Sequence, residues 1–158
     1  FGEDIYEQPK WPEEPLFYAC VPSKTDQSVS PDGCENVFLL MPVSPDIEGS
    51  DDIHTHYLNL MLDRISDFTG EEIKAENIVF KRSFAHQEFK DRYHAFKGNA
   101  YGLANTLKQT AIFKPKMMNP KINNLVYAGQ LTVPGPGVPP SLISGKLAAE
   151  LAIKHCKI

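Results

Sequence analysis

The pattern of apolar and polar positions is most regular between residues 49 and 70. Apolar side chains recur there at the spacing of one helix face, at Ile53, Tyr57, Met61, Ile65 and Phe68. Gly49-Ser50-Asp51-Asp52 is typical of a helix start, and Gly70 is typical of a helix stop. The sequence therefore predicts an amphipathic helix between these two signals.

A second helical pattern runs from Pro140 to His155. Proline is tolerated in the first turn of a helix, and apolar side chains follow at every fourth position, at Ile143, Leu147 and Leu151. Small residues give this helix a second side that lets another backbone approach closely, namely Gly145, Ala148, Ala149 and Ala152. A shorter helix is expected from Ala85 to Tyr93.

Two short runs, Leu16 to Val21 and Val37 to Met41, are apolar on both faces. This is typical of strands in a sheet that is covered on both sides. The connection between them is rich in Ser, Asp, Pro and Gly and contains the turn signal Pro31-Asp32-Gly33. These features predict an antiparallel pair of strands joined by a long loop.

Two further strands are predicted from the same kind of pattern. Residues from Asn77 to Phe84 alternate between two faces, one of them more polar, and Leu125 to Ala128 form an apolar run that ends at Gly129. The second run is expected to be a buried strand that needs neighbours, but no other stretch after residue 93 resembles a strand. Its unpaired edges predict pairing with another chain, or a displaced or irregular segment in the isolated chain.

The order of these elements indicates the fold class. Strand, strand, helix, strand, short helix, loop, strand and helix predict an α+β or mixed α/β fold with an antiparallel sheet. The first 15 residues are predicted to be extended, because they contain Pro9, Pro12 and Pro15.

Composition limits the classes of function. The chain has 158 residues, of which 42% are hydrophobic and 23% charged, as in an ordinary globular domain. Its formal net charge of −4 lacks the basic footprint of a nucleic-acid binder. One local cluster, Lys114, Lys116 and Lys121 around Met117 and Met118, suits either contact with an anionic membrane surface or a solvated loop.

Cysteine and histidine spacing gives no metal or disulfide signature. The three cysteines form no C-x-x-C pair, which favours a reducing cytoplasm, and no apolar run approaches the ~20 residues of a membrane span. His54 and His56 are two positions apart on the predicted helix, so they face different directions and cannot chelate one metal. No hydrolase signature surrounds Ser141, Ser144 or the cysteines.

The segment from Gln130 to Pro140 contains four prolines and two glycines between the last predicted strand and helix. A strand, a Gly-rich turn and a helix can direct backbone N–H groups at an anion such as a diphosphate. However, the segment matches neither the P-loop pattern nor the dinucleotide fingerprint. On the pattern alone, a proline-stiffened connection into a packed helix remains an equal alternative.

The identities of the residues carry more information than the pattern of glycines and prolines alone. The stretch from Tyr127 to Glu150, with its Pro-Gly-Pro-Gly-Val-Pro turn, resembles the C-terminal flavin-contact segment of bacterial-type phytoene desaturases, which belong to the amine-oxidase-like flavoprotein superfamily. The stretch from Gly98 to Pro115 is similar to a second segment of that family, with Lys114 in place of the usual arginine. Residues 17 to 39, with Thr25-Asp26 and Pro31-Asp32-Gly33-Cys34-Glu35-Asn36, resemble a third.

The resemblance implies a division of the chain and a cofactor. Residues 1–97 would be part of a substrate-binding domain with the antiparallel sheet, and residues 98–158 the C-terminal part of a split FAD-binding domain. The family's N-terminal G-x-G-x-x-G half has no counterpart in these residues. The expected contacts with FAD are Gly129, Gln130, Leu131, Gly137, Val138 and Pro139. No catalytic residue is assigned and no metal is expected.

The implied activity is desaturation of a carotenoid precursor, a long isoprenoid, by the complete FAD-dependent enzyme, with the isolated chain inactive. Aromatic and other apolar side chains of the predicted strands would line an apolar channel or fill the core: Phe17, Tyr18, Phe38, Leu40, Met41, Phe80 and Phe84. Alternatives are a related carotenoid isomerase, later-step desaturase or ketolase, another amine-oxidase-like flavoenzyme, and a non-catalytic binding module.

Overall fold

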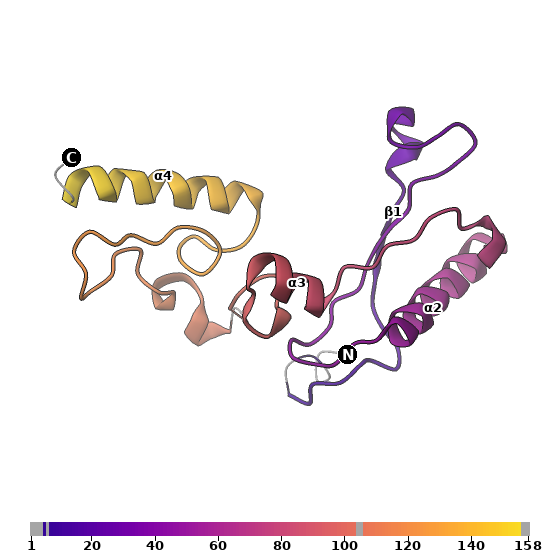
Figure 1. Cartoon of the computed structure of the whole chain (residues 1–158), viewed down its shortest axis with the longest axis horizontal. Helices are drawn as coiled ribbons and strands as arrows, with labels where there is room; N and C mark the ends of the chain where they lie inside the picture. Colours follow the sequence, from indigo (N-terminus) through magenta and orange to yellow (C-terminus); the bar gives the residue numbers. More distant parts are fainter. Residues whose placement is uncertain (1–4, 6, 104–105, 156–158) are drawn as a thin grey trace. The chain divides into compact units, whose positions relative to one another are not determined.

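The computed structural model of the chain describes residues 5, 7–103 and 106–155, and they form two compact units, residues 1–99 and 100–158 (Figure 1). Within the described residues there are three α-helices and one two-stranded antiparallel sheet. The chain is thus mostly helical with little β-structure. The α+β prediction is correct for the antiparallel pair and the helices but overestimated the sheet.

The first unit is built on helix α2 (Asp51–Thr69). The Ser50 hydroxyl accepts a hydrogen bond from the Ile53 N–H over 3.2 Å, which caps the helix start. Gly70 ends the helix in the left-handed conformation at φ 75°, and its N–H donates to the Ser66 carbonyl over 2.8 Å. The predicted helix and both of its end signals are confirmed.

The extended N-terminal segment packs along this helix. Trp11 stacks on Tyr57 with ring centroids 5.0 Å apart, and the Tyr57 hydroxyl donates to the Pro12 carbonyl over 2.8 Å. The Arg64 guanidinium donates to the Pro15 carbonyl over 2.7 Å. Pro12 and Pro15 are fully buried, so the prolines contribute to the small core of this unit as well as keeping the segment extended.

The predicted antiparallel pair is present as β1 (Tyr18–Cys20) and β2 (Phe38–Leu40), with Ala19 opposite Leu39. Two 3₁₀-helices, η1 (Pro22–Lys24) and η2 (Gln27–Val29), lie in the long connection between them. The expectation of a sheet covered on both sides is wrong for the described chain, because Tyr18 and Phe38 are 58% and 51% exposed.

The strand predicted from Asn77 to Phe84 is absent from the described structure. After η3 (Ala75–Asn77), the chain forms no ladder until helix α3 (His86–Tyr93), which confirms the predicted short helix. Val79 and Phe80 are largely exposed. A strand without a partner strand leaves its backbone N–H and C=O groups without hydrogen bonds. The alternating pattern alone therefore does not stabilise a strand here, and the segment is irregular.

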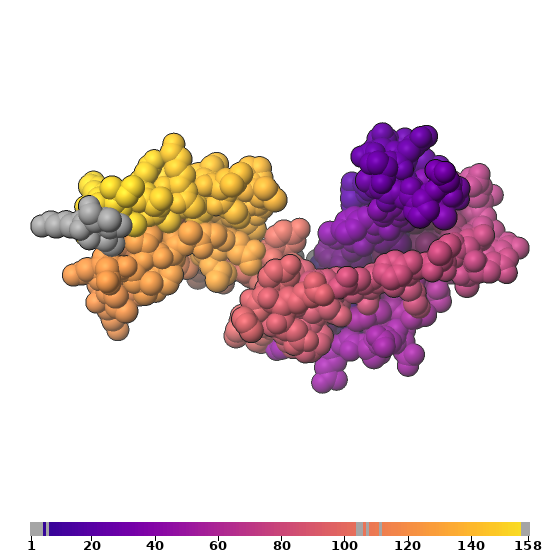
Figure 2. All heavy atoms as spheres, turned by 45° about the horizontal axis from the view of Figure 1, so that its top comes forward, coloured from indigo at the N-terminus to yellow at the C-terminus, as the bar shows by residue number. Residues whose placement is uncertain are grey.

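The second unit contains the 3₁₀-helices η5 (Leu107–Gln109) and η6 (Ala111–Phe113) and helix α4 (Val138–His155), which starts two residues earlier than predicted. The buried strand predicted at Leu125–Ala128 is wrong, because only a single antiparallel bridge joins Val126 to Met118. In Figure 2, α4 lies over the loop that precedes it. Among the described helices, none is long and apolar enough to cross a membrane.

Candidate functional site

The turn before α4 and the first two residues of α4 contain the six residues predicted to contact a cofactor. Leu131, Gly137, Val138 and Pro139 are exposed, while Gly129 and Gln130 are half-buried. The predicted residues therefore lie in one continuous segment, from the turn into the start of α4, with much of its surface accessible. The turn runs from residue 129 to residue 137 and leads directly into α4.

A buried serine of α4 holds the start of this turn. The Gly129 N–H donates to the Ser144 hydroxyl oxygen over 2.9 Å, and Ser144 is 0% exposed. Because Ser144 lies in the second turn of α4, this hydrogen bond fixes the start of the loop against the helix that follows the loop.

A buried threonine holds the middle of the turn. The Thr132 hydroxyl donates to the Pro115 carbonyl over 2.7 Å, and the Thr132 N–H donates to the Gly129 carbonyl over 3.3 Å. Thr132 is 1% exposed. The segment around Pro115 also accepts a hydrogen bond at Met117, from the Tyr127 N–H over 2.6 Å. The turn is therefore attached to two separate parts of its own unit.

Two glycines of the turn have backbone angles that side chains rarely adopt. Gly129 has φ 101°, and a β-carbon there would meet no atom within 4 Å, so this backbone faces open space. Gly137 has φ 114°, and its β-carbon would lie 3.3 Å from Cδ of Pro140. Gly129 is therefore open on the side where a β-carbon would lie, whereas the Pro140 ring occupies that side of Gly137.

The start of α4 is a weak anion site. Pro139 and Pro140 have no N–H group, and the Ser141 N–H donates to the Gly137 carbonyl over 2.9 Å. The helix start therefore offers fewer N–H donors than an ordinary one. The turn therefore lacks the N–H donors of a diphosphate cradle.

Lys114 adds a buried cationic side chain beneath the turn. It is 6% exposed, and its Cε and Nζ atoms lie 3.3 and 3.4 Å from the position of a β-carbon on Gly135. This is the residue that departs from the arginine of the resembled family. Sequence reasoning had placed it in a surface cluster, whereas the structure buries it against the turn.

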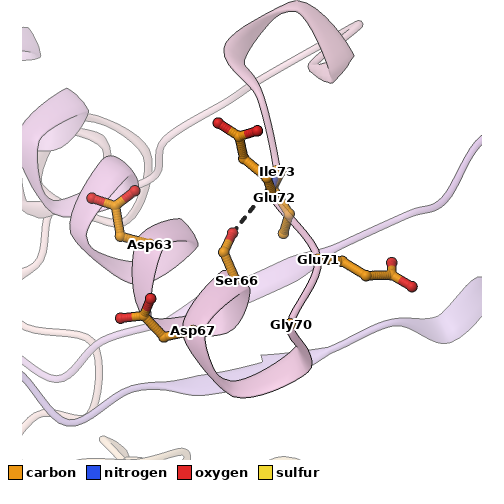
Figure 3. A pocket seen from close by; sticks show the side chains of 7 residues that line it. All are labelled: Asp63, Ser66, Asp67, Gly70, Glu71, Glu72 and Ile73. Atoms are coloured by element: carbon orange, nitrogen blue, oxygen red, sulfur yellow. Dashed lines mark hydrogen bonds between the residues drawn. The ribbon is translucent and has the colours of Figure 1, made fainter.

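Outside the turn, a hollow lies at the end of α2 (Figure 3). The Ser66 hydroxyl accepts a hydrogen bond from the Ile73 N–H over 3.1 Å there, and the lining is mainly carboxylate: Asp63, Asp67, Glu71 and Glu72. Such a lining repels phosphates and does not suit an apolar polyene. Among the described residues, no group of three His, Cys, Asp or Glu side chains could hold a metal ion.

His86 is a buried residue that the sequence did not single out. Its Nε2 donates to the Ser44 carbonyl over 2.7 Å, because a carbonyl can only accept. Its ring also lies edge-on to Trp11, with centroids 6.2 Å apart. His86 thus packs in the core of the first unit. The helical spacing of the sequence did not predict its contacts with Ser44 and Trp11.

Comparison with known proteins agrees with the resemblance of the sequence motifs. No protein-family model matches the chain. The carotenoid 3,4-desaturase of Haloarcula japonica is 43% identical over 152 residues, which is 96% of this chain and 30% of that protein. The 4,4'-diapophytoene desaturase (4,4'-diaponeurosporene-forming) of Staphylococcus aureus strain Newman is 33% identical over 150 residues, 89% of this chain and 29% of that protein.

The chain spans about 30% of the length of both curated relatives. Similarity at this level across nearly all of the chain extends well beyond the turn before α4. The chain is therefore homologous to a segment that makes up about 30% of the length of carotenoid desaturases.

Proposed function

We propose that this chain is the C-terminal portion of an FAD-dependent desaturase of the phytoene desaturase type, which introduces double bonds into a carotenoid precursor. The observation that carries the proposal is the 43% identity to a carotenoid desaturase over 96% of the chain. Its substrate would be a long isoprenoid, and its main partner the FAD-binding half that precedes this segment in the resembled family.

In this proposal, the turn before α4 lies against the flavin through Gly129, Gln130, Leu131, Gly137, Val138 and Pro139. FAD, when bound, supplies the two-electron acceptor that side chains lack. The open backbone at Gly129 allows close approach, and the exposed side chains of Leu131 and Val138 would exclude water from the ring. The residues of this chain thus orient the ring and shield it.

Residues 1–97 would contribute to the substrate-binding domain and residues 98–158 to the FAD-binding domain. The exposed apolar side chains of the β1–β2 pair, Tyr18, Phe38 and Leu40, support the first assignment, because they offer an apolar surface that the described core does not use. The earlier alternative, that these three side chains fill the core of this chain, is contradicted by their exposure.

The enzyme would act in the cytoplasm. It would also contact a membrane peripherally, because its substrate is a lipid. Cys20 and Cys34 are free thiols, which agrees with a reducing compartment. A related isomerase, later-step desaturase or ketolase, another flavoenzyme, and a non-catalytic binding module remain the alternative functions. Both relatives are desaturases, which favours desaturation over these alternatives.

A segment exchange tests the proposal. The matching segment of the Haloarcula japonica desaturase is replaced by this chain, and the hybrid is compared with the unmodified relative and with a form that lacks the segment. We expect the hybrid to bind FAD and to convert its carotenoid substrate to a product with longer-wavelength absorption, whereas the deleted form does neither. A folded, flavin-loaded hybrid that converts no carotenoid would contradict desaturation.

A further inference from the structure

Two buried hydroxyl groups anchor the turn before α4 to the rest of its unit. Thr132 and Ser144 are 1% and 0% exposed, and each makes one hydrogen bond to a backbone group outside its own element. We propose that they are positioning residues that hold the turn in the shape that receives the flavin. This inference rests on the function proposed above.

The two hydrogen bonds lie on either side of two of the six residues expected at the cofactor, Gln130 and Leu131. Ser144 accepts from the N–H of Gly129, and Thr132 donates to the carbonyl of Pro115. Gln130 and Leu131 lie between these two anchors, so their backbone is fixed on both sides. A backbone hydrogen bond from the Thr132 N–H to the Gly129 carbonyl, over 3.3 Å, closes the short loop between these two residues.

Burial makes each hydroxyl costly to remove. With Val at position 132 the Pro115 carbonyl loses its donor, and with Ala at position 144 the Gly129 N–H loses its acceptor. An unpaired buried backbone group favours shapes of the turn in which water reaches that group. A smaller fraction of the protein molecules then has the turn in the shape that binds FAD. The apparent affinity for FAD falls by the same factor.

The test uses Thr132→Val and Ser144→Ala in the full-length protein that carries this chain. The dissociation constant of FAD is measured by quenching of flavin fluorescence, and hydrogen exchange of the 129–137 backbone is measured without flavin. We expect about tenfold weaker FAD binding and faster exchange in both variants, with the KM for the polyene unchanged. Thr132→Ser, which keeps the hydroxyl, should restore most of the affinity.

Thr25→Val is the matched control, because the Thr25 hydroxyl also donates to a proline carbonyl, that of Pro22, over 3.0 Å, but is exposed and lies in the first unit. It should leave FAD affinity unchanged. If Ser144→Ala does not fold, Ser144→Cys gives the same comparison, because a thiol fills similar space but accepts hydrogen bonds weakly.

The outcomes separate the two proposals. Variants that lose thermal stability but bind FAD as the wild type does would overturn the positioning role alone. A folded wild-type protein that binds no FAD would overturn the proposed function together with the positioning role. Slower or unchanged hydrogen exchange at residues 129–137 in both variants would also overturn the positioning role, whatever the activity.

Discussion

A β-carbon on Gly137 would lie 3.3 Å from Cδ of Pro140, at the point where the turn enters α4. The proline ring is rigid and belongs to the first turn of the helix, so it has little freedom to move away. In addition, the Gly137 backbone has φ 114°, a conformation that costs other residues roughly 1–3 kcal/mol. A side chain at position 137 therefore changes the shape of this turn.

The first prediction is that Gly137→Val reduces flavin retention in the full-length protein. A β-branched side chain must shift the backbone at the turn, which displaces Val138 and Pro139 from the proposed contact. The measurement is the ratio of flavin to protein after gel filtration, by absorbance. We expect a loss of at least about tenfold in affinity, which corresponds to roughly 1.4 kcal/mol.

Gly33→Val is the control for this variant. Gly33 also has a positive φ, 74°, and nothing lies within 4 Å of its β-carbon position, but it belongs to the loop between β1 and β2. It carries similar backbone strain without touching the turn, so its flavin content should stay near that of the wild type. Equal flavin content in folded Gly137→Val and wild-type protein would refute the placement of the turn.

Helix α2 could be predicted closely because its signals are local. Ser50 and Gly70 act through bonds to residues three or four positions away, and the apolar spacing needs no knowledge of the partner surface. The β1–β2 pairing was also predictable, since a single loop with clear turn residues joins the two strands. These elements depend on neighbours in the sequence.

The strands at 77–84 and 125–128 could not be predicted in the same way. A strand is stabilised by its neighbours, and the pattern of Leu125 to Ala128 says only that it suits an apolar environment. The described residues give it one bridge, from Val126 to Met118.

The candidate turn was predictable as a segment, but its anchors were not. Gly137 and the prolines are visible in the sequence as a stiff turn. The burial of Thr132, Ser144 and Lys114 depends on contacts with residues 15 or more positions away, as the Ser144–Gly129 and Thr132–Pro115 bonds illustrate. The small-residue side of α4 also lacks its expected neighbour among the described residues, because a β-carbon on Gly145 would meet nothing within 4 Å.

The second prediction concerns the stability of the first unit. A β-carbon on Gly98 would lie 2.7 Å from the His86 carbonyl oxygen and 2.8 Å from the His86 Cα. Both are backbone atoms, so Gly98→Ala forces the segment away from α3 and should cost roughly 2–3 kcal/mol. Urea unfolding of the purified chain, followed by the fluorescence of Trp11, measures this loss.

The contrasting variant is Gly145→Ala in α4. No atom lies within 4 Å of that β-carbon position, and a helix-interior Gly→Ala change typically stabilises by about 0.5–1 kcal/mol. We expect a higher thermal midpoint for Gly145→Ala and a lower one for Gly98→Ala. Equal midpoints for Gly98→Ala and the wild type would mean that the close contact with His86 is not formed.

The third prediction is a pH dependence that Glu88 contributes. The Ala85 N–H donates to the Glu88 carboxylate over 2.8 Å at the start of α3, and this hydrogen bond lowers the pKa of Glu88 below its ordinary value of 4.5. A lowered pKa adds stability that is fully present above about pH 4.5 and is lost as the pH falls through the folded-state pKa. Glu88→Gln removes this contribution, because glutamine does not titrate.

The measurement for Glu88 is the urea midpoint of the chain between about pH 7 and pH 3. Wild-type protein should lose stability on acidification more steeply than Glu88→Gln, and the two midpoints should approach each other at the acidic end. Glu88→Asp is a useful comparison, since the shorter side chain reaches the Ala85 N–H less well. Parallel curves for wild type and Glu88→Gln would show that the capping bond does not persist in solution.

The last prediction is that this 158-residue chain, purified alone, binds no stoichiometric FAD and is colourless. The chain contains no G-x-G-x-x-G motif, and the start of α4 has prolines at positions 139 and 140 where N–H donors would be needed.

Each missing charge-assisted hydrogen bond to the diphosphate is worth roughly 1.5–3 kcal/mol, so loss of several converts micromolar affinity to millimolar or weaker. The test is a visible absorption spectrum after incubation with excess FAD and gel filtration, with a complete FAD enzyme as positive control. A yellow protein with about one flavin per chain would mean that the turn before α4 and its own unit bind the cofactor without a separate diphosphate cradle.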